Sequence, residues 1–330
     1  MDRYALVQDW LTRQLPGRTF SLAPASADAS FRRYFRVTLP DATLIVMDAP
    51  PEQEDCRPFV QVAGLMAAAG LNVPAILAQD LARGFLLLSD LGSTTYLAAL
   101  NYDNADGLFR DATGALIRWQ LASREGVLPL YDEALLRREL DLFPEWYLRR
   151  HLGIELDVRQ RQSLEAVFRL ILSNNLAQPR TYVHRDYMPR NLMLSEPNPG
   201  VLDFQDAVYG PITYDVASLF KDAFVCWDEQ RVLDWTIRYW ERARLAGLPV
   251  NSDFGEFYRD CEWMGLQRHL KVLGIFARIC HRDGKPAYVK DTPRFLGYVR
   301  AVAERYASLA PLLHLLDKLA DRKPAIGYTF

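Results

Sequence analysis

The sequence predicts an α+β fold of two lobes, a small N-terminal lobe with an antiparallel five-stranded sheet and a larger, mostly helical C-terminal lobe. Five strand-like runs and one helix come before a break at residues 89–92, and long stretches of helical periodicity come after it. The chain shows no internal repeat and no low-complexity linker. We therefore place the lobe boundary after Gly92, giving lobes of residues 1–92 and 93–330.

The N-terminal lobe is expected to begin with a helix over residues 1–15, which Pro16 and Gly17 end. A second helix is expected over residues 56–69, with Gly70 as its C-cap. Runs rich in β-branched and aromatic residues predict five strands, at residues 19–23, 31–39, 43–47, 73–78 and 85–88.

The C-terminal lobe is expected to be mainly helical. Apolar residues recur at helical spacing over residues 95–100, 105–123, 133–151, 158–176, 228–246, 253–282 and 292–320. Two short strands are expected at residues 191–194 and 200–204, joined by a turn rich in proline and glycine.

Composition excludes several classes of protein. The 330 residues carry 39 basic and 41 acidic side chains, a net charge of -2, with no basic stripe that would indicate a nucleic-acid partner. The four cysteines form no C-x-x-C pair, so we expect neither a zinc site nor disulfides, but free thiols in a reducing compartment. The N-terminus lacks the pattern of a signal peptide, and no apolar run is long enough to cross a bilayer. We expect a cytoplasmic protein without a membrane partner.

The motif His184-x-Asp186-x-x-x-x-Asn191, followed by Asp203-Phe204, is the most informative feature of the chain. Phosphoryl-transfer enzymes use this spacing to place a base and two metal ligands around a nucleotide. Asp186 is the expected base, and Asn191 and Asp203 offer the hard oxygen atoms that Mg²⁺ prefers. His184 is expected to support the loop by hydrogen bonds to its backbone. The alternative, ordinary turn acids and a cap residue, would not require all three spacings at once.

The stretch of residues 182–220 resembles the aminoglycoside-phosphotransferase-like small-molecule kinases, which share the protein-kinase fold. One branch of that family is more similar still, the bacterial kinases that phosphorylate the anomeric hydroxyl of N-acetylmuramate and N-acetylglucosamine. This closer resemblance covers nearly the whole chain and is carried by residues 29–37, 46–51, 136–147, 203–219 and 263–268.

The resemblance implies a protein-kinase-like fold, ATP and Mg²⁺ as cofactors, and a sugar 1-phosphate product used in peptidoglycan sugar recycling. The turn from Ser26 to Ser30 would cover the phosphates. Ser89, Asp90 and Leu91 would form the hinge whose backbone pairs with adenine. Asp215 would brace the catalytic loop, although an acid that caps a helix beginning near residue 216 is an equal alternative.

The chain departs from the protein-kinase pattern at the nucleotide site. Met47 stands where a phosphate-binding lysine is expected, so another cation must take that role. Strand alternation places Arg32 and Arg36 on one face and Arg33 on the other. We expect Arg32 to contact the phosphates, with solvated strand-face cations as the alternative. Gln205 replaces the glycine of D-F-G. Met188 replaces the lysine two residues after the base, which favours a small-molecule acceptor.

The acceptor site is less well defined by the sequence. Arg268 and Lys271 share a helix face, and a cation there would suit the lactyl carboxylate of N-acetylmuramate. The alternative is a solvated helix face. The set of residues expected to bind the sugar is Glu139, Asp141, Asp206, Arg268 and Lys271.

Two other functions remain open at this stage. A kinase of the same fold could act on an aminoglycoside, choline, homoserine or a thiosugar, although polycationic aminoglycosides would require a site lined with carboxylates. The missing lysine also allows a non-catalytic nucleotide-binding protein, but such a protein needs no base together with two metal ligands. The expected partners are ATP and a sugar, and the sequence leaves the oligomeric state open, with a monomer compatible.

Overall fold

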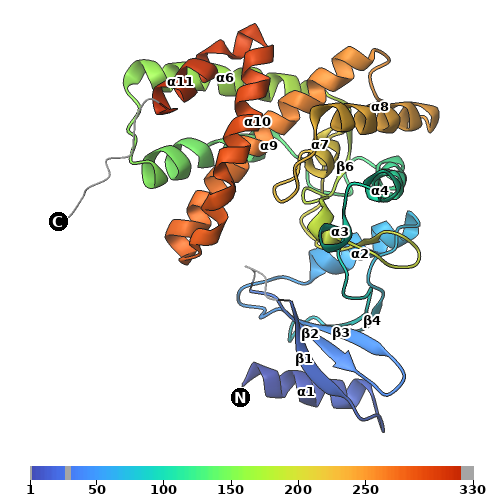
Figure 1. Ribbon diagram of the computed structural model, residues 1–330. Coiled ribbons are helices and arrows are strands. Elements are labelled where there is room, and N and C mark those ends of the chain that lie inside the picture. Colours follow the sequence, from blue (N-terminus) through green and yellow to red (C-terminus); the bar gives the residue numbers. More distant parts are fainter. Residues whose placement is uncertain (1, 27–30, 321–330) are drawn as a thin grey trace, which may run out of the picture. The chain divides into compact units, whose positions relative to one another are not determined.

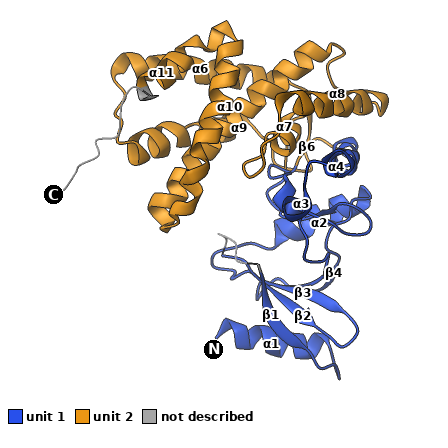
Figure 2. Ribbon diagram, in the orientation of Figure 1, with its two compact units in different colours: residues 1–122, 184–207 blue, residues 123–183, 208–330 orange. Residues whose placement is uncertain are grey.

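The computed structural model describes residues 2–26 and 31–320. The chain forms two compact units, residues 1–122 with 184–207 and residues 123–183 with 208–330 (Figure 2). Each unit is therefore built from two separate stretches of sequence. The expected division into a nucleotide-binding lobe of residues 1–92 and a catalytic lobe of residues 93–330 stays a prediction.

The first unit contains the five-stranded antiparallel sheet that the sequence predicts (Figure 1). Its strands lie in the order β1-β2-β3-β5-β4. Their bounds are β1 Ser21–Ser26, β2 Arg33–Thr38, β3 Thr43–Asp48, β4 Ile76–Asp80 and β5 Phe85–Ser89. Helix α1 (Arg3–Gln14) packs Val7, Trp10 and Leu11 against apolar side chains of the sheet, as helical spacing requires.

A buried carboxylate ties α1 to the sheet. Asp48, at the end of β3, is fully buried. Arg3 donates to its Oδ1 at 2.8 Å and Arg33 donates to its Oδ2 at 3.0 Å, so each guanidinium binds one carboxylate oxygen. Arg3 also donates to the carbonyl of Arg83 at 2.7 Å and lies over the ring of Phe85. The pairing offsets the desolvation of Asp48 and fixes the position of α1 on the sheet.

The rest of the first unit positions the catalytic segment. Helix α2 (Arg57–Ala68) lies between β3 and β4 in the sequence, and α3 (Tyr96–Ala99) and α4 (Ala105–Leu121) follow β5. Residues 123–183 belong to the second unit, and the chain then returns to the first. There, residues 184–207 form the 3₁₀ turn η2 (Pro189–Asn191) and the antiparallel strand pair β7 (Leu192–Met193) and β8 (Gly200–Val201). The buried Tyr187 donates to the carbonyl of Ala112 at 2.8 Å, which anchors this segment on α4.

The second unit is helical apart from one short strand pair. The core is centred on α9, whose buried residues Met264, Leu270 and Leu273 pack with side chains from α6, η1 and α10. The strands of the second unit are β6 (Arg180–Val183) and β9 (Val208–Pro211), which pair antiparallel. Its helices are α5 (Glu133–Leu140), the π-helix η1 (Phe143–His151), α6 (Val158–Ala177), α7 (Tyr214–Phe220), α8 (Glu229–Leu245), α9 (Phe254–Asp283), η3 (Pro286–Asp291), α10 (Thr292–Arg305), η4 (Ala307–Leu309) and α11 (Ala310–Ala320).

Two expected helices are broken, and proline explains both breaks. The helix expected over residues 133–151 ends at Leu140, because the ring of Pro144 conflicts with the carbonyl four residues earlier, and continues as the wider η1. The helix expected over residues 292–320 ends at Arg305 and restarts at Ala310, because Pro311 has no N–H for the helical hydrogen bond. Strands β6 and β9 were not expected from the sequence.

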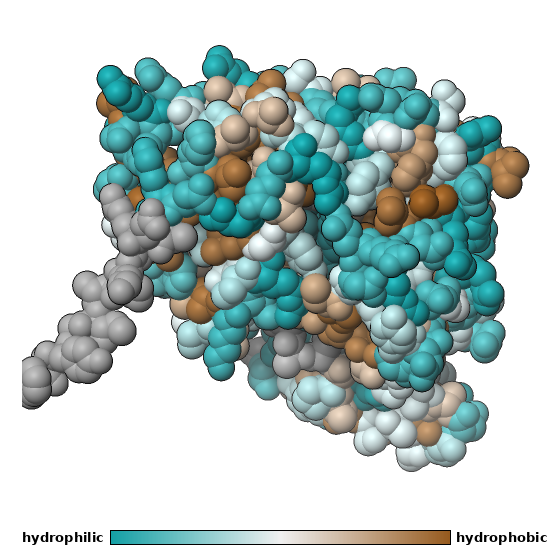
Figure 3. Space-filling view, turned by 45° about the horizontal axis from the view of Figure 1, so that its top comes forward, coloured by the Kyte–Doolittle hydropathy of each residue, from teal (hydrophilic) through white to brown (hydrophobic). Residues whose placement is uncertain are grey.

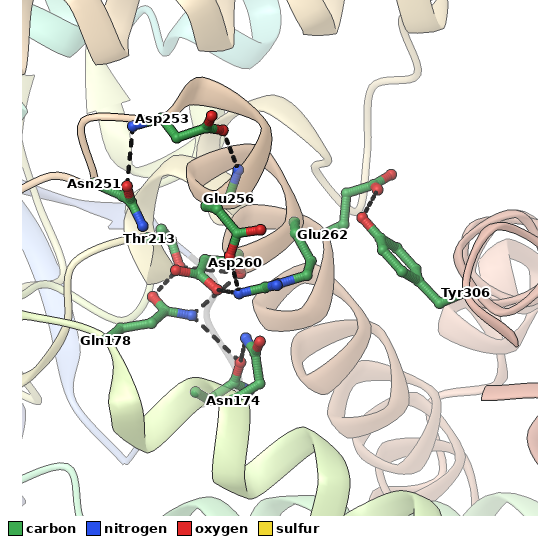
Figure 4. Close-up of polar contacts among 11 residues, drawn as sticks. Asn174, Gln178, Thr213, Asn251, Asp253, Glu256, Asp260, Glu262 and Tyr306 are labelled. Carbon is green, nitrogen blue, oxygen red and sulfur yellow. Dashed lines mark hydrogen bonds and ion pairs between the residues drawn. The ribbon is translucent and has the colours of Figure 1, made fainter. Parts of the chain in front are cut away.

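Polar side chains fix the N-terminal half of α9 to its neighbours (Figure 4). Gln178, just after α6, donates to the carbonyl of Asp260 at 3.2 Å. Thr213 donates to Gln178 Oε1 at 2.6 Å, which joins the start of α7 to the same point. Burial raises the pKa of Asp260, and its carboxylate is bonded to Asn174. This network holds the helix that carries Arg268 and Lys271.

Hydrophilic residues predominate on the face shown in Figure 3. None of the helices in the described part of the chain combines the length and apolarity needed to cross a membrane. The four cysteines are free, as expected; Cys56 and Cys261 are buried, whereas Cys226 is exposed.

Candidate active site

The structure brings together the two expected metal ligands and the backbone of the expected base. Asn191 donates from Nδ2 to Oδ2 of Asp203 at 3.3 Å and to the backbone carbonyl of Asp186 at 2.9 Å. The backbone N–H of Leu202 donates to the carbonyl of Asn191 at 2.9 Å. Residues 12 positions apart in sequence are thereby held as one cluster, with the amide oxygen of Asn191 left as its ligand atom for a cation.

His184 supports this loop through both of its ring nitrogens. Its Nδ1 lies 3.3 Å from the backbone N–H of Asp186, which donates to it, and its Nε2 donates to the carbonyl of Leu202 at 3.0 Å. The side chain is fully buried, and burial lowers the pKa of His184 to about 4. The imidazole is therefore neutral at pH 7, as this pattern of one acceptor and one donor requires.

Asp203 has a backbone conformation that few non-glycine residues adopt. Its φ is 63°, in the left-handed region, and Arg185, in the loop after β6, has a φ of 75°. Such conformations cost free energy and occur often at active sites, where the surrounding structure enforces them. The side chain of Asp203 is exposed, and Gln205 donates to its Oδ1 at 2.9 Å.

A cavity of about 360 Å³ lies against this cluster, and its whole lining belongs to the first unit. Apolar side chains of the sheet and of the catalytic segment form part of the wall, among them Ile45, Leu88, Met193 and Leu202. Its polar lining includes Arg32, Arg36, Arg190, Asn191 and Asp203. Apolar walls with a few charged groups suit a flat base that carries phosphates.

The expected hinge, residues 89–91, also lines the cavity, as does Gly92 after it. Its start is fixed by Ser89, whose N–H donates to the carbonyl of Ala75 and whose Oγ accepts from the Ala75 N–H at 2.8 Å. Its end is fixed by Arg36, which donates to Asp90 Oδ2 at 2.7 Å and to the carbonyl of Gly92 at 2.9 Å.

Arg32 and Arg36 both line the cavity and Arg33 instead binds Asp48, so the predicted alternation is confirmed. Arg36 binds Asp90 and the carbonyl of Gly92. Arg32 pairs with Glu54 at 2.8 Å, and its side chain is 12% exposed. Met47 is fully buried and offers the cavity no charge. The role of Arg32 at the phosphates stays a prediction, and the structure adds Glu54 as its carboxylate partner.

The donor set suits Mg²⁺ better than a softer metal. Within residues 2–26 and 31–320, no group of three or more histidine, cysteine or acidic side chains could hold an ion. Asn191 offers an amide oxygen and Asp203 a carboxylate, both hard oxygen ligands, and the Nδ2 of Asn191 holds the two side chains together. Mg²⁺ bound to nucleotides typically takes only one or two protein ligands of this type, with phosphate oxygens and waters completing its coordination. The residues present therefore fit a nucleotide-bound Mg²⁺.

Most of the expected sugar-binding residues lie in the second unit, and two of them pair with each other. Lys271 lies 2.9 Å from Glu139 Oε1 and donates to the hydroxyl of Tyr214 at 2.9 Å. Arg268 and Lys271 are 3% and 8% exposed, so the alternative of a solvated helix face is wrong. Asp141 is exposed and accepts from Arg137 at 2.9 Å, and Asp206, in the first unit, is exposed. Their contact with a sugar stays a prediction.

Three further expected residues are Asp215, Ser26 and Ser30. Asp215 is buried in the first turn of α7, in the second unit, where it can serve that helix's N-terminus. Ser26 is the last residue of β1, and Ser30 lies outside the described residues. The phosphate-covering role of the turn from Ser26 to Ser30 stays a prediction.

Sequence reasoning missed Glu54 and the contact of Gln205 with Asp203. Glu54 lies three residues before α2 and pairs with Arg32, and no periodic pattern in the sequence indicates that pair. Gln205 was noted only as a replacement for glycine, although its place two residues after a metal ligand was a signal that it could contact that ligand.

Comparison with known proteins gives consistent results. A model of the phosphotransferase enzyme family matches residues 21–248. The chain is 61% identical to N-acetylmuramate/N-acetylglucosamine kinase of Pseudomonas aeruginosa, over 90% of this chain and 88% of that protein. It is 51% identical to the protein of the same name from Neisseria meningitidis, over 100% of both chains. A solved structure of an ADP-bound aminoglycoside phosphotransferase is similar in fold, with a TM-score of 0.56 at 14% identity over 89% of this chain and 97% of that one.

Proposed function

Because the chain belongs to the phosphotransferase enzyme family, we propose that it is an ATP-dependent sugar kinase that phosphorylates the anomeric C1 hydroxyl of N-acetylmuramate, N-acetylglucosamine or both. The product would be the sugar 1-phosphate. A free sugar with this substitution pattern arises from cell-wall turnover, so the proposed role is peptidoglycan sugar recycling in the cytoplasm.

One observation carries the proposal: Asn191 binds the carboxylate of Asp203 and the backbone of Asp186 in one cluster beside a cavity of about 360 Å³. Phosphoryl transfer demands little covalent chemistry from a protein and depends on positioning and charge stabilisation. A base, two oxygen ligands and a walled cavity are the parts that this reaction needs.

In the proposed reaction, the C1 oxygen forms a bond to the γ-phosphorus of ATP while the bond from that phosphorus to the β–γ bridging oxygen breaks. Asp186 accepts the proton of the hydroxyl, and ADP leaves with the bridging oxygen. Asn191 and Asp203 would hold Mg²⁺, which supplies positive charge to the phosphate oxygens. Arg32, held by Glu54 at 2.8 Å, would contribute a further positive charge in place of the absent lysine.

The acceptor is the part of the proposal that rests most on the relatives. Two chains named N-acetylmuramate/N-acetylglucosamine kinase are 61% and 51% identical to this one. N-acetylmuramate carries a lactyl carboxylate, and the buried cations Arg268 and Lys271 are candidates to recognise it, with Glu139, Asp141 and Asp206 as candidates for sugar hydroxyls.

The test incubates the protein with ATP, Mg²⁺ and each amino sugar, and follows the product by phosphorus NMR. A phosphate coupled to the anomeric proton is expected, as is a fall of about 10²–10⁴-fold in kcat for Asp186→Asn. Arg124→Ala, at a position outside the described cluster and cavity, is the control and should retain activity. A product phosphorylated elsewhere, or undiminished turnover by Asp186→Asn, would refute the proposal.

A panel of other acceptors distinguishes the remaining same-fold alternative. Aminoglycosides, choline, homoserine and a thiosugar are each offered with ATP and Mg²⁺, and ADP release is measured. We expect the amino sugars to give the highest kcat/KM. Nucleotide binding without turnover on any acceptor would support a non-catalytic protein instead.

A further inference from the structure

We propose that Arg36 and Asp90 form a clamp that sets the conformation of residues 90–92 and thereby determines nucleotide affinity and the choice of nucleobase. This inference rests on the proposed function, because it assigns the clamp to the nucleotide site of that reaction. Arg36 and Asp90 are 54 positions apart in the sequence, and the fold brings them together at the cavity.

The clamp consists of four hydrogen bonds around one carboxylate and one carbonyl. Arg36 donates from Nε to Asp90 Oδ2 at 2.7 Å and from Nη2 to Asp90 Oδ1 at 3.2 Å. The same Nη2 donates to the carbonyl of Gly92 at 2.9 Å, and the N–H of Gly92 donates to Asp90 Oδ1 at 3.0 Å. Asp90 thus binds both a side chain and the backbone two residues ahead of it.

The charge state of Asp90 matches this arrangement. Burial alone raises the pKa of Asp90, but the hydrogen bonds from Arg36 and from the N–H of Gly92 outweigh burial and lower it below its ordinary value. The carboxylate is therefore ionised at pH 7, and both oxygens serve as acceptors. A bidentate pair of this kind fixes orientation as well as distance.

The clamp acts on backbone that faces the cavity. Residues 89–93 all line it, and Gly92 has a φ of 99°, which favours glycine. Ser89 holds the start of this segment to Ala75, and Arg36 holds its end. With both ends fixed, the peptide groups of Asp90 and Leu91 keep one orientation toward a base in the cavity.

The places of Arg36 and Asp90 in the fold also indicate that the pair shapes the cavity and is not needed to hold the sheet together. Arg36 lies in the middle of β2, where backbone pairing with Ala23 and Ile45 already secures the strand. Its side chain is 29% exposed and that of Asp90 is 5% exposed, so the pair lies at the wall of the cavity. Purines differ in the order of donors and acceptors on the edge that such a backbone segment reads, so its orientation decides which base binds better.

The experiment compares wild type with Arg36→Ala, Asp90→Ala and the double variant. Affinity for Mg²⁺ADP is measured by calorimetry, and kcat and KM are measured for ATP and for GTP with the preferred sugar. Arg18→Ala is the matched control, because Arg18, which precedes β1, forms an exposed pair with Asp41 in the turn between β2 and β3, and neither residue lines the cavity.

Each single variant should raise the KM for ATP and the Kd for ADP about tenfold while changing kcat less than about threefold. The effect of the double variant should be smaller than the product of the two single effects, because the two residues share two of the four hydrogen bonds. The ratio of kcat/KM for ATP over GTP should also shift by at least about threefold, which a loss of stability alone would not cause.

The inference is overturned if folded variants bind ADP as wild type does with an unchanged ATP-to-GTP ratio. It is equally overturned if the two single effects multiply in the double variant. Arg36→Lys, which keeps one charge and loses the second donor, should give an intermediate KM. If wild type binds ADP but phosphorylates no sugar, the proposed function fails while the clamp is still tested by Kd.

Discussion

Gln205 donates a hydrogen bond of 2.9 Å from Nε2 to Oδ1 of Asp203, while Asn191 donates to the other oxygen of the same carboxylate at 3.3 Å. Both oxygens of the expected metal ligand are therefore oriented by side-chain amides. Partners that orient a ligand in this way tune how strongly it holds a metal ion.

Gln205→Leu should therefore weaken the response to Mg²⁺ rather than abolish turnover. We expect the Mg²⁺ concentration for half-maximal activity to rise about tenfold, with kcat largely restored at saturating Mg²⁺. The measurement is a Mg²⁺ titration of initial rates at fixed ATP. Gln79→Leu, on the exposed side of β4, is the control and should titrate as wild type does. An unaltered Mg²⁺ requirement in Gln205→Leu would show that this hydrogen bond does not affect Mg²⁺ binding.

Arg32 and Glu54 should behave as one unit in kinetics. Arg32→Ala should lower kcat/KM for ATP about 10²-fold, and Glu54→Ala about tenfold, because Arg32 then loses the carboxylate that orients it. The double variant should match Arg32→Ala. Arg57→Ala, which removes an exposed pair with Asp55, is the control. Equal and multiplicative effects of the two substitutions would contradict a shared role.

The Asp48 pairing predicts a large effect on stability. Asp48→Ala leaves Arg3 and Arg33 without their buried partner and should lower the free energy of unfolding by about 2–3 kcal/mol. The loss should stay below that of a fully buried pair, because both guanidinium groups reach solvent. Urea unfolding followed by tryptophan fluorescence measures it. Asp41→Ala, which removes an exposed pair with Arg18, should cost less than about 0.5 kcal/mol, and a similar cost for both would refute the prediction.

Two buried histidines predict how stability depends on pH. Burial lowers the pKa of His184 to about 4 and that of His269 to about 3, whereas a histidine in the unfolded chain has an ordinary pKa of 6.5. Below pH 6.5 the unfolded state binds more protons, so the stability held above pH 6.5 is lost as pH falls toward the folded pKa values.

Each group should contribute a slope of up to about 1.4 kcal/mol per pH unit between pH 6 and pH 4. His184→Gln and His269→Gln should each flatten the dependence of the unfolding free energy on pH, and the second variant tests the effect if the first does not fold. His314→Gln, at an exposed position on α11, is the control and should keep the wild-type slope. Identical slopes in all four proteins would contradict the assignment.

The sequence predicted most reliably those features that local pattern determines. The β-branched and aromatic residues of 31–39 and 43–47 predicted two of the strands, and alternation predicted the side of the sheet on which Arg32 and Arg36 lie. The spacing of Asp186, Asn191 and Asp203 gave a cluster that the fold indeed assembles. In both cases the information lies within a few residues or within one motif.

Features that depend on pairing between distant residues could not be predicted in this way. Glu139 and Lys271 were expected at a sugar site, yet they bind each other across 132 positions inside the second unit, and no local pattern reveals such a pair. Asp90 was expected to contribute only its backbone to the hinge, and its side-chain contact with Arg36 was not predicted. Pro144 and Pro311 did carry a local signal, but apolar periodicity on both sides of each proline concealed the breaks.

The division of the chain has a consequence for how its specificity can change. The cavity, the hinge and the metal ligands all belong to residues 1–122 and 184–207, whereas Glu139, Asp141, Arg268 and Lys271 belong to the other unit. Under the proposed function, substitutions in the latter would change which alcohol is phosphorylated while the phosphate donor is handled as before. Recombining the two portions among relatives is therefore a practical route to kinases with altered acceptor preference.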